Sequence, residues 1–204
     1  MRFLPFSRSL ALLAGATLLF TGCPGCDTCG EPPSYTLTDT QRAWAAPYPL
    51  NKVLRFRNAA TGYERTYRVR THQDTIVQVH SNTDCPGYRW EMHSAVIERT
   101  DSASVPHEVL HGLFITAEAP SNSYRVGMNW GLAGFNLPAK EIDAGRLNLS
   151  PATFAGRTYQ QVIQSTFTAT TPETSPRTVA RIYLTKAEGI IRFEERGGSI
   201  WDLM

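Results

Sequence analysis

The feature that most constrains the fold is an alternation of apolar and polar residues that recurs along the chain from Asn51 onward. Its clearest example is the stretch 88–93, where Tyr88, Trp90 and Met92 alternate with polar residues. Successive side chains of a β-strand point to opposite faces, so this period indicates a strand with one buried face. We therefore expect the apolar side chains of this stretch to face the core and the polar ones to face solvent.

The same period recurs in short stretches separated by turn signals, such as the segments 58–62 and 197–198. The strands expected from it are 54–57, 63–70, 75–80, 88–93, 110–117, 124–130, 159–167, 179–185, 190–195 and 200–203. Helical periodicity is nearly absent, although Thr38 and Gln41 form a capping-box pattern that predicts a short helix ending before Pro47. The sequence therefore predicts a mainly β fold with one short N-terminal helix, either an antiparallel sandwich or a partly open barrel.

The N-terminal residues predict an export signal. Arg2 and Arg8 precede an apolar run over 10–20 that is too short to span a bilayer, and small residues follow it. The stretch 19–23, LFTGC, resembles the lipobox of bacterial lipoproteins, which implies cleavage before Cys23 and attachment of lipid to its thiol. We expect a cleaved signal peptide over 1–22, a flexible tether over 23–34 that carries the lipid, and one β-rich domain over 35–204.

The charge balance argues against nucleic acid as a partner. The chain has 20 lysines and arginines against 18 aspartates and glutamates, and loss of Arg2 and Arg8 with the signal peptide makes the two numbers equal. Nucleic-acid-binding proteins need a clustered basic excess, which the remaining chain lacks.

Longer segments resemble a known group of proteins. They are the opening 35–38 with Trp44 and residues 47–48, the hairpin 54–67 (LRFRNAATGYERTY), the segment 156–162, and the ending 182–203 (IYLTKAEGIIRFEERGGSIWDL). These segments resemble small uncharacterised lipoproteins of Bacteroidetes-type bacteria. The resemblance implies a lipoprotein of the cell envelope, anchored at the outer membrane, and it supplies no activity.

The cysteines are Cys23, Cys26, Cys29 and Cys85. If Cys23 carries lipid, three thiols remain, and an oxidising exported compartment favours one disulfide and one free thiol. Cys26 and Cys29 can close a small loop with each other, or either can pair with Cys85. The sequence leaves these pairings open.

One motif offers an enzymatic alternative. His107, Glu108 and His111 match H-E-x-x-H, which resembles the signature of zinc metallopeptidases, with the two histidines as ligands and Glu108 as general base. Histidines four apart share one face of a helix, but on a strand they lie about 13 Å apart, too far for one zinc ion. The following Gly112 and the β-branched residues beyond it favour a strand, so the motif is more consistent with ordinary structural residues. Glu118 and Glu141 are the acidic residues available as a third ligand.

Two surface features are candidates for binding. The first hairpin is basic, with Lys52, Arg55, Arg57, Arg65, Arg68 and Arg70, and such a face can hold an anionic glycan or lipid headgroups. Aromatic side chains that can stack on a ligand are Tyr88, Trp90, Trp130, Phe135, Phe193 and Trp201, although at a period of two we expect them in the core.

We therefore expect a non-enzymatic binding or structural module without a cofactor, held at the membrane by its N-terminal lipid. An anionic glycan or another envelope protein is the expected partner. The alternatives are a zinc peptidase that uses the motif at 107–111, with zinc as its cofactor, and a carrier of a lipophilic ligand inside a β cavity.

Overall fold

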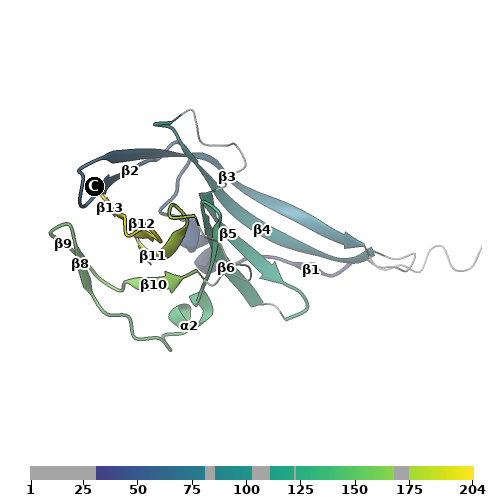
Figure 1. Cartoon of the computed structure of the whole chain (residues 1–204). Coiled ribbons are helices and arrows are strands. Elements are labelled where there is room, and N and C mark those ends of the chain that lie inside the picture. The colour runs from purple at the N-terminus through teal and green to yellow at the C-terminus, as the bar shows by residue number, and fades with distance from the viewer. Residues whose placement is uncertain (1–30, 81–85, 103–110, 122, 168–174) are drawn as a thin grey trace, which may run out of the picture. The chain divides into compact units, whose positions relative to one another are not determined.

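Antiparallel hairpins build one large sheet, which curls around a hydrophobic interior (Figure 1). The computed structural model describes residues 31–80, 86–102, 111–121, 123–167 and 175–204, which belong to a unit running from Glu31 to Met204. Its elements are β1 (Ser34–Tyr35), α1 (Asp39–Arg42), the 3-10 helix η1 (Ala43–Ala45), β2 (Val53–Asn58), β3 (Glu64–His80), β4 (Pro86–Arg99), β5 (His111–Glu118), β6 (Ser123–Trp130), β7 (Ala133–Leu137), α2 (Ala139–Asp143), β8 (Ala152–Phe154), β9 (Arg157–Tyr159), β10 (Ile163–Thr166), β11 (Val179–Thr185), β12 (Gly189–Glu195) and β13 (Ile200–Leu203). The predicted signal peptide, Cys23, Cys26, Cys29 and Cys85 lie outside the described residues.

The main sheet is nearly closed into a barrel. Its strands follow the order β10-β11-β12-β13-β2-β3-β4-β5-β6-β7, and β1 joins β4 off this path. The two end strands approach each other, because Ser165 Oγ on β10 donates to Asn136 O on β7 at 3.4 Å. Beside this contact the rings of Phe135 and Phe167 lie 6.2 Å apart. The predicted mainly β fold is thus confirmed, and of its two forms the partly open barrel is the one observed.

The capping box forms as the sequence predicts. Thr38 Oγ1 accepts from Gln41 N at 3.3 Å, and the Gln41 side chain accepts from Thr38 N at 2.8 Å. The helix α1 and its continuation η1 end before Pro47. The sequence did not predict α2, whose last residue, Asp143, joins three elements by accepting from Trp44 Nε1 at 3.1 Å, Tyr124 OH at 2.6 Å and Lys186 Nζ at 2.6 Å.

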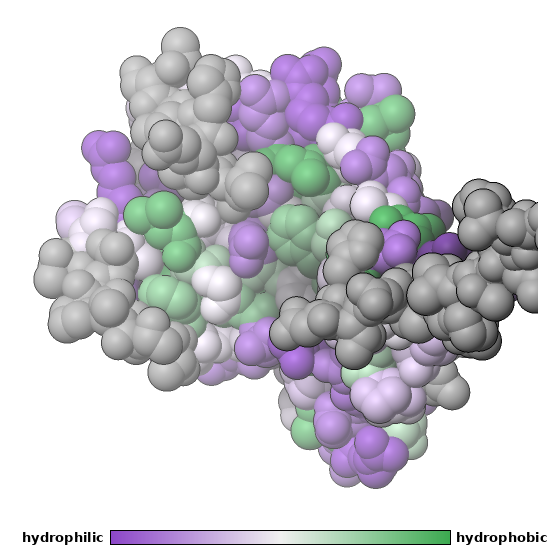
Figure 2. Space-filling view, turned by 90° about the vertical axis from the view of Figure 1, so that its right-hand side faces the viewer, coloured by the Kyte–Doolittle hydropathy of each residue, from purple (hydrophilic) through white to green (hydrophobic). Residues whose placement is uncertain are grey.

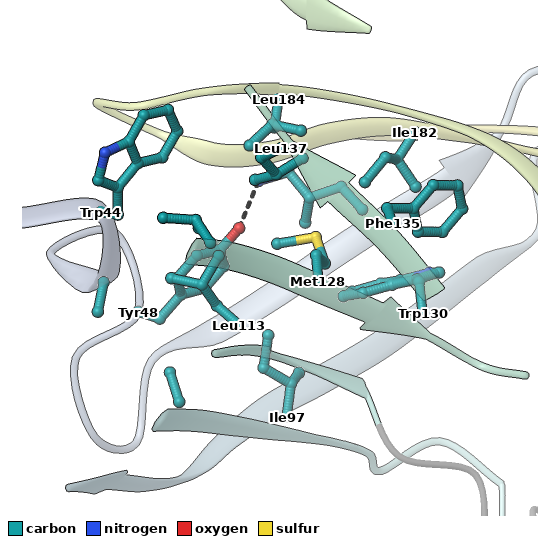
Figure 3. Close-up of a cluster of buried hydrophobic side chains, with 14 of the residues drawn as sticks. Trp44, Tyr48, Ile97, Leu113, Met128, Trp130, Phe135, Leu137, Ile182 and Leu184 are labelled. Carbon is teal, nitrogen blue, oxygen red and sulfur yellow. Dashed lines mark hydrogen bonds between the residues drawn. The ribbon is translucent and has the colours of Figure 1, made fainter. Parts of the chain in front are cut away.

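Aliphatic and aromatic side chains together fill the described interior (Figure 3). The Trp130 ring lies 5.7 Å from that of Phe56, 5.0 Å from that of Tyr67 and 5.5 Å from that of Phe193. Because these rings pack edge-on or tilted against one another, the space between opposite walls of the barrel is occupied by side chains.

Tyr48 closes the interior on the side of the N-terminal helices and is 1% exposed. Its hydroxyl accepts from Ile190 N at 2.8 Å, the contact drawn in Figure 3. Gly189 makes room for this ring: it has a φ of +80°, and a Cβ built on it would lie 2.6 Å from the Tyr48 ring and hydroxyl. A side chain at this glycine is therefore excluded by both the backbone and the packing.

An arm extends from the barrel where β3 and β4 run on beyond their other neighbours (Figure 1). The strand β3 pairs with β2 only over Glu64–Arg68, and β4 pairs with β5 only from Met92 onward. The sequence predicted two strands over 63–80, but β3 is continuous, with a register shift between Val69 and Thr71. The name arm is used below for the outer part of this hairpin, residues 75–79 and 87–92. The arm also includes β1, which pairs in parallel with β4.

Candidate functional site

On β4 the buried and the exposed face of the arm are the reverse of what the sequence predicts. On one face Ile76 is paired with Glu91, and Asp74 with His93. These polar partners are buried, Glu91 being 3% and His93 5% exposed. On the other face Trp90 is paired with Val77, and there the apolar side chains stay partly exposed. The prediction that the apolar residues of 88–93 face the core is therefore wrong.

On this face Ile76 of β3 is 55% exposed and the Asp74 side chain 53% exposed, whereas Glu91 is buried because α1 and the residues before it contact it and supply a counter-charge. Glu91 accepts from Arg42 Nε at 2.9 Å, from Arg42 Nη2 at 2.6 and 2.8 Å, and from the backbone N of Leu37 at 2.9 Å. A buried carboxylate is tolerated when charge and hydrogen bonds compensate it in this way. This contact, which we call the clamp, fixes the N-terminal segment to the arm.

His93 lies next to the clamp. Its Nδ1 is 2.7 Å from Asp74 Oδ1, and this hydrogen bond holds the pKa of Asp74 below its ordinary value. The ring of His72 lies 4.6 Å away, and among the described residues His93 Nε2 has no hydrogen-bond partner. A carboxylate can orient a histidine as a general base, but no described hydroxyl or thiol is hydrogen-bonded to His93, so the pair lacks a nucleophile.

The apolar face opens into a hollow of about 510 Å³ between the arm and the β5–β6 hairpin. The hollow is lined by Tyr88, Trp90, Thr116, Ala117, Glu118, Ala119, Ser121 and Arg125. The ring of Tyr35 meets that of Tyr88 edge-on, with centroids 6.2 Å apart. Figure 2 views the molecule from the side on which the arm projects, and hydrophobic residues gather near the middle of this view with hydrophilic ones around them.

The wall of the hollow carries paired charges. Glu118 accepts from Lys140 Nζ at 2.8 Å, and Arg125 Nη2 lies 3.0 Å from its other carboxylate oxygen. The hydrogen bond from Lys140 is the main reason that the pKa of Glu118 lies below its ordinary value. The lining thus holds one cation and one anion, and the Arg125 side chain is 67% exposed, whereas Lys140 contacts Glu118 from outside the lining.

The other aromatic candidates are in the core, as expected. Trp130, Phe135, Phe193 and Trp201 are all 5% exposed or less. The wall residues of the hollow were not identified as a ligand site from the sequence, because Thr116 and Arg125 come beside the β4 residues only through the pairing of β4 with β5 and of β5 with β6. Glu118, considered as a possible zinc ligand, is bonded to two cations.

The basic hairpin does not form one cationic surface. Arg65 enters the end of the barrel, where it pairs with Glu195 at 2.6 Å and its guanidinium lies 3.7 Å from the centroid of the Trp201 ring. Arg57 pairs with Glu64 at 2.8 Å, and Arg70 pairs with Glu98 of β4. The remaining residues of the run are Lys52, whose Nζ donates to Pro47 O at 2.8 Å, and the exposed Arg55 and Arg68. Most of the positive charge is therefore used within the fold.

The zinc motif is described in part. His111 is the first residue of β5 and is 6% exposed, with its ring 5.2 Å from that of Tyr67 and 4.8 Å from that of Trp130. His107 and Glu108 lie outside the described residues. In the part of the chain that is described, no three His, Cys, Asp or Glu side chains are grouped closely enough to hold a metal ion. The zinc site stays a prediction, but His111 is a packed strand residue.

Two further hollows, of about 610 and 670 Å³, adjoin each other beside β2 and share Arg157, Leu203 and Met204 in their linings. Charges at these hollows are paired, since Arg157 Nη2 lies 2.6 Å from Glu188 and Arg192 binds Asp202 with two nitrogens. The arm hollow differs because its lining includes two partly exposed aromatic rings.

Among the described residues, no helix combines the length and the apolar character that a membrane span requires. Comparisons with protein-family models, with curated proteins and with solved structures found no match for this chain. The resemblance to small bacterial lipoproteins therefore stays a prediction.

Proposed function

We propose that this chain is a lipid-anchored protein of the cell envelope, attached through Cys23, that acts without catalysis as a binding module. The arm hollow carries the binding part of the proposal, because it combines two partly exposed aromatic rings with the charged side chains of Glu118 and Arg125. Ligand sites are typically concave and combine apolar and aromatic side chains with a few oriented polar groups, and the arm hollow holds both kinds of group, with a lining that is more polar than apolar.

The alternatives have less support. A carrier needs an interior cavity, whereas rings such as those of Phe56, Trp130 and Phe193 occupy the described interior. A zinc peptidase of this kind needs both histidines of the motif on one face of a helix, whereas His111 lies on a strand among aromatic rings. A binding or structural role makes neither demand.

The anchor is tested by labelling cells that express the chain with radioactive palmitate. We expect label on the wild type and none on Cys23→Ala, because only that cysteine follows the lipobox. Cys26→Ala is the matched control, since it removes a neighbouring thiol, and it should keep the label. Label that persists in Cys23→Ala would reject Cys23 as the anchor. Fractionation of the envelope by density then assigns the membrane, which we expect to be the outer one.

A further inference from the structure

The apolar side of the arm forms a continuous surface without a described cover. Its members share one face of three neighbouring strands and are each partly exposed. We call it the aromatic face; its residues are Tyr35, Val77, Val79, Tyr88, Trp90 and Met92. Apolar side chains that stay open while polar ones beside them are buried indicate a surface used for contact.

The N-terminal segment joins the domain beside this face. Arg89 N donates to Pro33 O at 2.9 Å, and Tyr35 is in register with Trp90. Pro33 lies ten positions after Cys23, and a chain of that length reaches at most about 35 Å. A lipid on Cys23 would therefore keep the arm, where the chain enters the fold, within about 35 Å of the bilayer.

We propose that the aromatic face docks on the surface of the membrane that holds the lipid anchor, with Trp90 and Tyr88 at the level of the lipid headgroups. This inference rests on the proposed anchor for its geometry. Tryptophan and tyrosine favour the membrane interface because their rings are apolar and their N–H or O–H groups reach water and headgroups. Arg125 lines the neighbouring hollow with a side chain that is 67% exposed, so it is available to anionic headgroups.

A bilayer fits the aromatic face better than a glycan does. A sugar would use the rings of Tyr88 and Trp90 and the polar wall, but Val77, Val79 and Met92 offer it neither a stacking ring nor a hydrogen bond. A headgroup layer covers the whole face, both its aliphatic and its aromatic members.

The fluorescence of Trp90 can report contact between the aromatic face and lipid. Of its four tryptophans, Trp44, Trp130 and Trp201 are 1%, 1% and 5% exposed, whereas Trp90 is partly exposed on the aromatic face. The lipidated chain is reconstituted into phosphatidylcholine vesicles with about one-third phosphatidylglycerol, with and without lipids brominated near the headgroup. We expect bromine to quench part of the tryptophan emission, and Trp90→Phe to abolish that part.

A second measurement removes the anchor. The Cys23→Ser chain is titrated with the same vesicles, and we expect weak binding that falls about tenfold in Trp90→Ala, because a partly buried aromatic side chain is lost from the interface. Tyr63→Ala is the matched control: Tyr63 is 70% exposed in the β2–β3 turn, at the other end of β3 from the arm, and its loss should leave binding unchanged.

The outcomes separate the two proposals. An anchored protein whose Trp90 emission is unquenched overturns docking and leaves the anchor intact. Quenching and vesicle binding by a chain that takes up no palmitate support docking and overturn the anchor. A shift of Trp90 emission with an acidic oligosaccharide, without any response to vesicles, overturns docking and identifies the hollow as a glycan site.

Discussion

The clamp between Arg42 and Glu91 gives the sharpest test of how the N-terminal segment is held. The Glu91 side chain is 4% exposed and that of Arg42 is 32% exposed. Arg42→Ala would leave the carboxylate buried with only the Leu37 N–H as a partner. Removing one member of a buried ion pair typically costs 3–5 kcal/mol, and because water can reach the Arg42 side we expect about 3 kcal/mol of lost unfolding free energy.

Arg57→Ala is the matched control, because the Arg57–Glu64 pair has a similar distance, 2.8 Å, but its side chains are 55% and 43% exposed. Exposed pairs contribute below about 1 kcal/mol. The measurement is urea unfolding of the Cys23→Ser chain followed by tryptophan fluorescence, with a constant slope as the check on comparability.

A double-mutant cycle isolates the charge pair. In the Glu91→Gln background the buried charge is gone, so Arg42→Ala should cost only about 1 kcal/mol, which gives a coupling of about 2 kcal/mol. If Arg42→Ala costs no more than Arg57→Ala, or if the coupling lies below about 0.5 kcal/mol, the burial argument is wrong.

Three further outcomes follow from packing, pH and metal binding. Gly189→Ala and Gly62→Ala share backbone strain of about 1 kcal/mol at φ values of +80° and +72°. Only Gly189→Ala meets Tyr48, so it should lose a further amount of roughly 1–3 kcal/mol in urea unfolding, and equal losses would contradict the contact. Burial alone would raise the pKa of Asp143, but three hydrogen-bond donors outweigh burial and lower this pKa in the folded state. The carboxylate of Asp143 therefore stabilises the fold fully above its unfolded-state pKa of 3.8, and this contribution is lost as the pH falls through its folded-state pKa. Acid titration of Asp143→Asn should therefore show a shallower loss below about pH 4, and an unchanged profile would remove this account. Elemental analysis of the chain purified without chelator should find less than about 0.1 zinc per molecule, whereas one zinc lost in His111→Ala would restore the peptidase hypothesis.

Local patterns predicted the elements whose causes are local. The capping box at Thr38 needs only Gln41, and the hairpin over 190–203 needs only alternation around a turn in which Gly198 takes a φ of +85°. The segment 159–167 was wrong as one strand because Gln161, with a φ of +53°, interrupts it between β9 and β10. Nothing in the apolar pattern marks that break.

The candidate site could be predicted only in part. Alternation over 88–93 shows that the two faces of the strand differ, and it correctly places Trp90 and Glu91 on opposite sides. It does not show which face is covered, because the cover depends on Arg42, which is far away in sequence and supplies the charge that buries Glu91. The apolar character of Tyr88, Trp90 and Met92 alone predicted that their face would be the covered one. The wall residue Arg125 likewise reaches the hollow through tertiary structure.

The parallel pairing of β1 with β4 has a mechanical consequence. A pull on the N-terminus, directed outward along the arm, would draw β1 lengthwise past β4. The hydrogen bond from Arg89 N to Pro33 O and the clamp would then be loaded together in shear, and would not open one after another. The load would pass into β4, whose other neighbours are the long β3 and β5. With the anchor that we propose at Cys23, the chain would therefore bear tension along the arm without its barrel being peeled open.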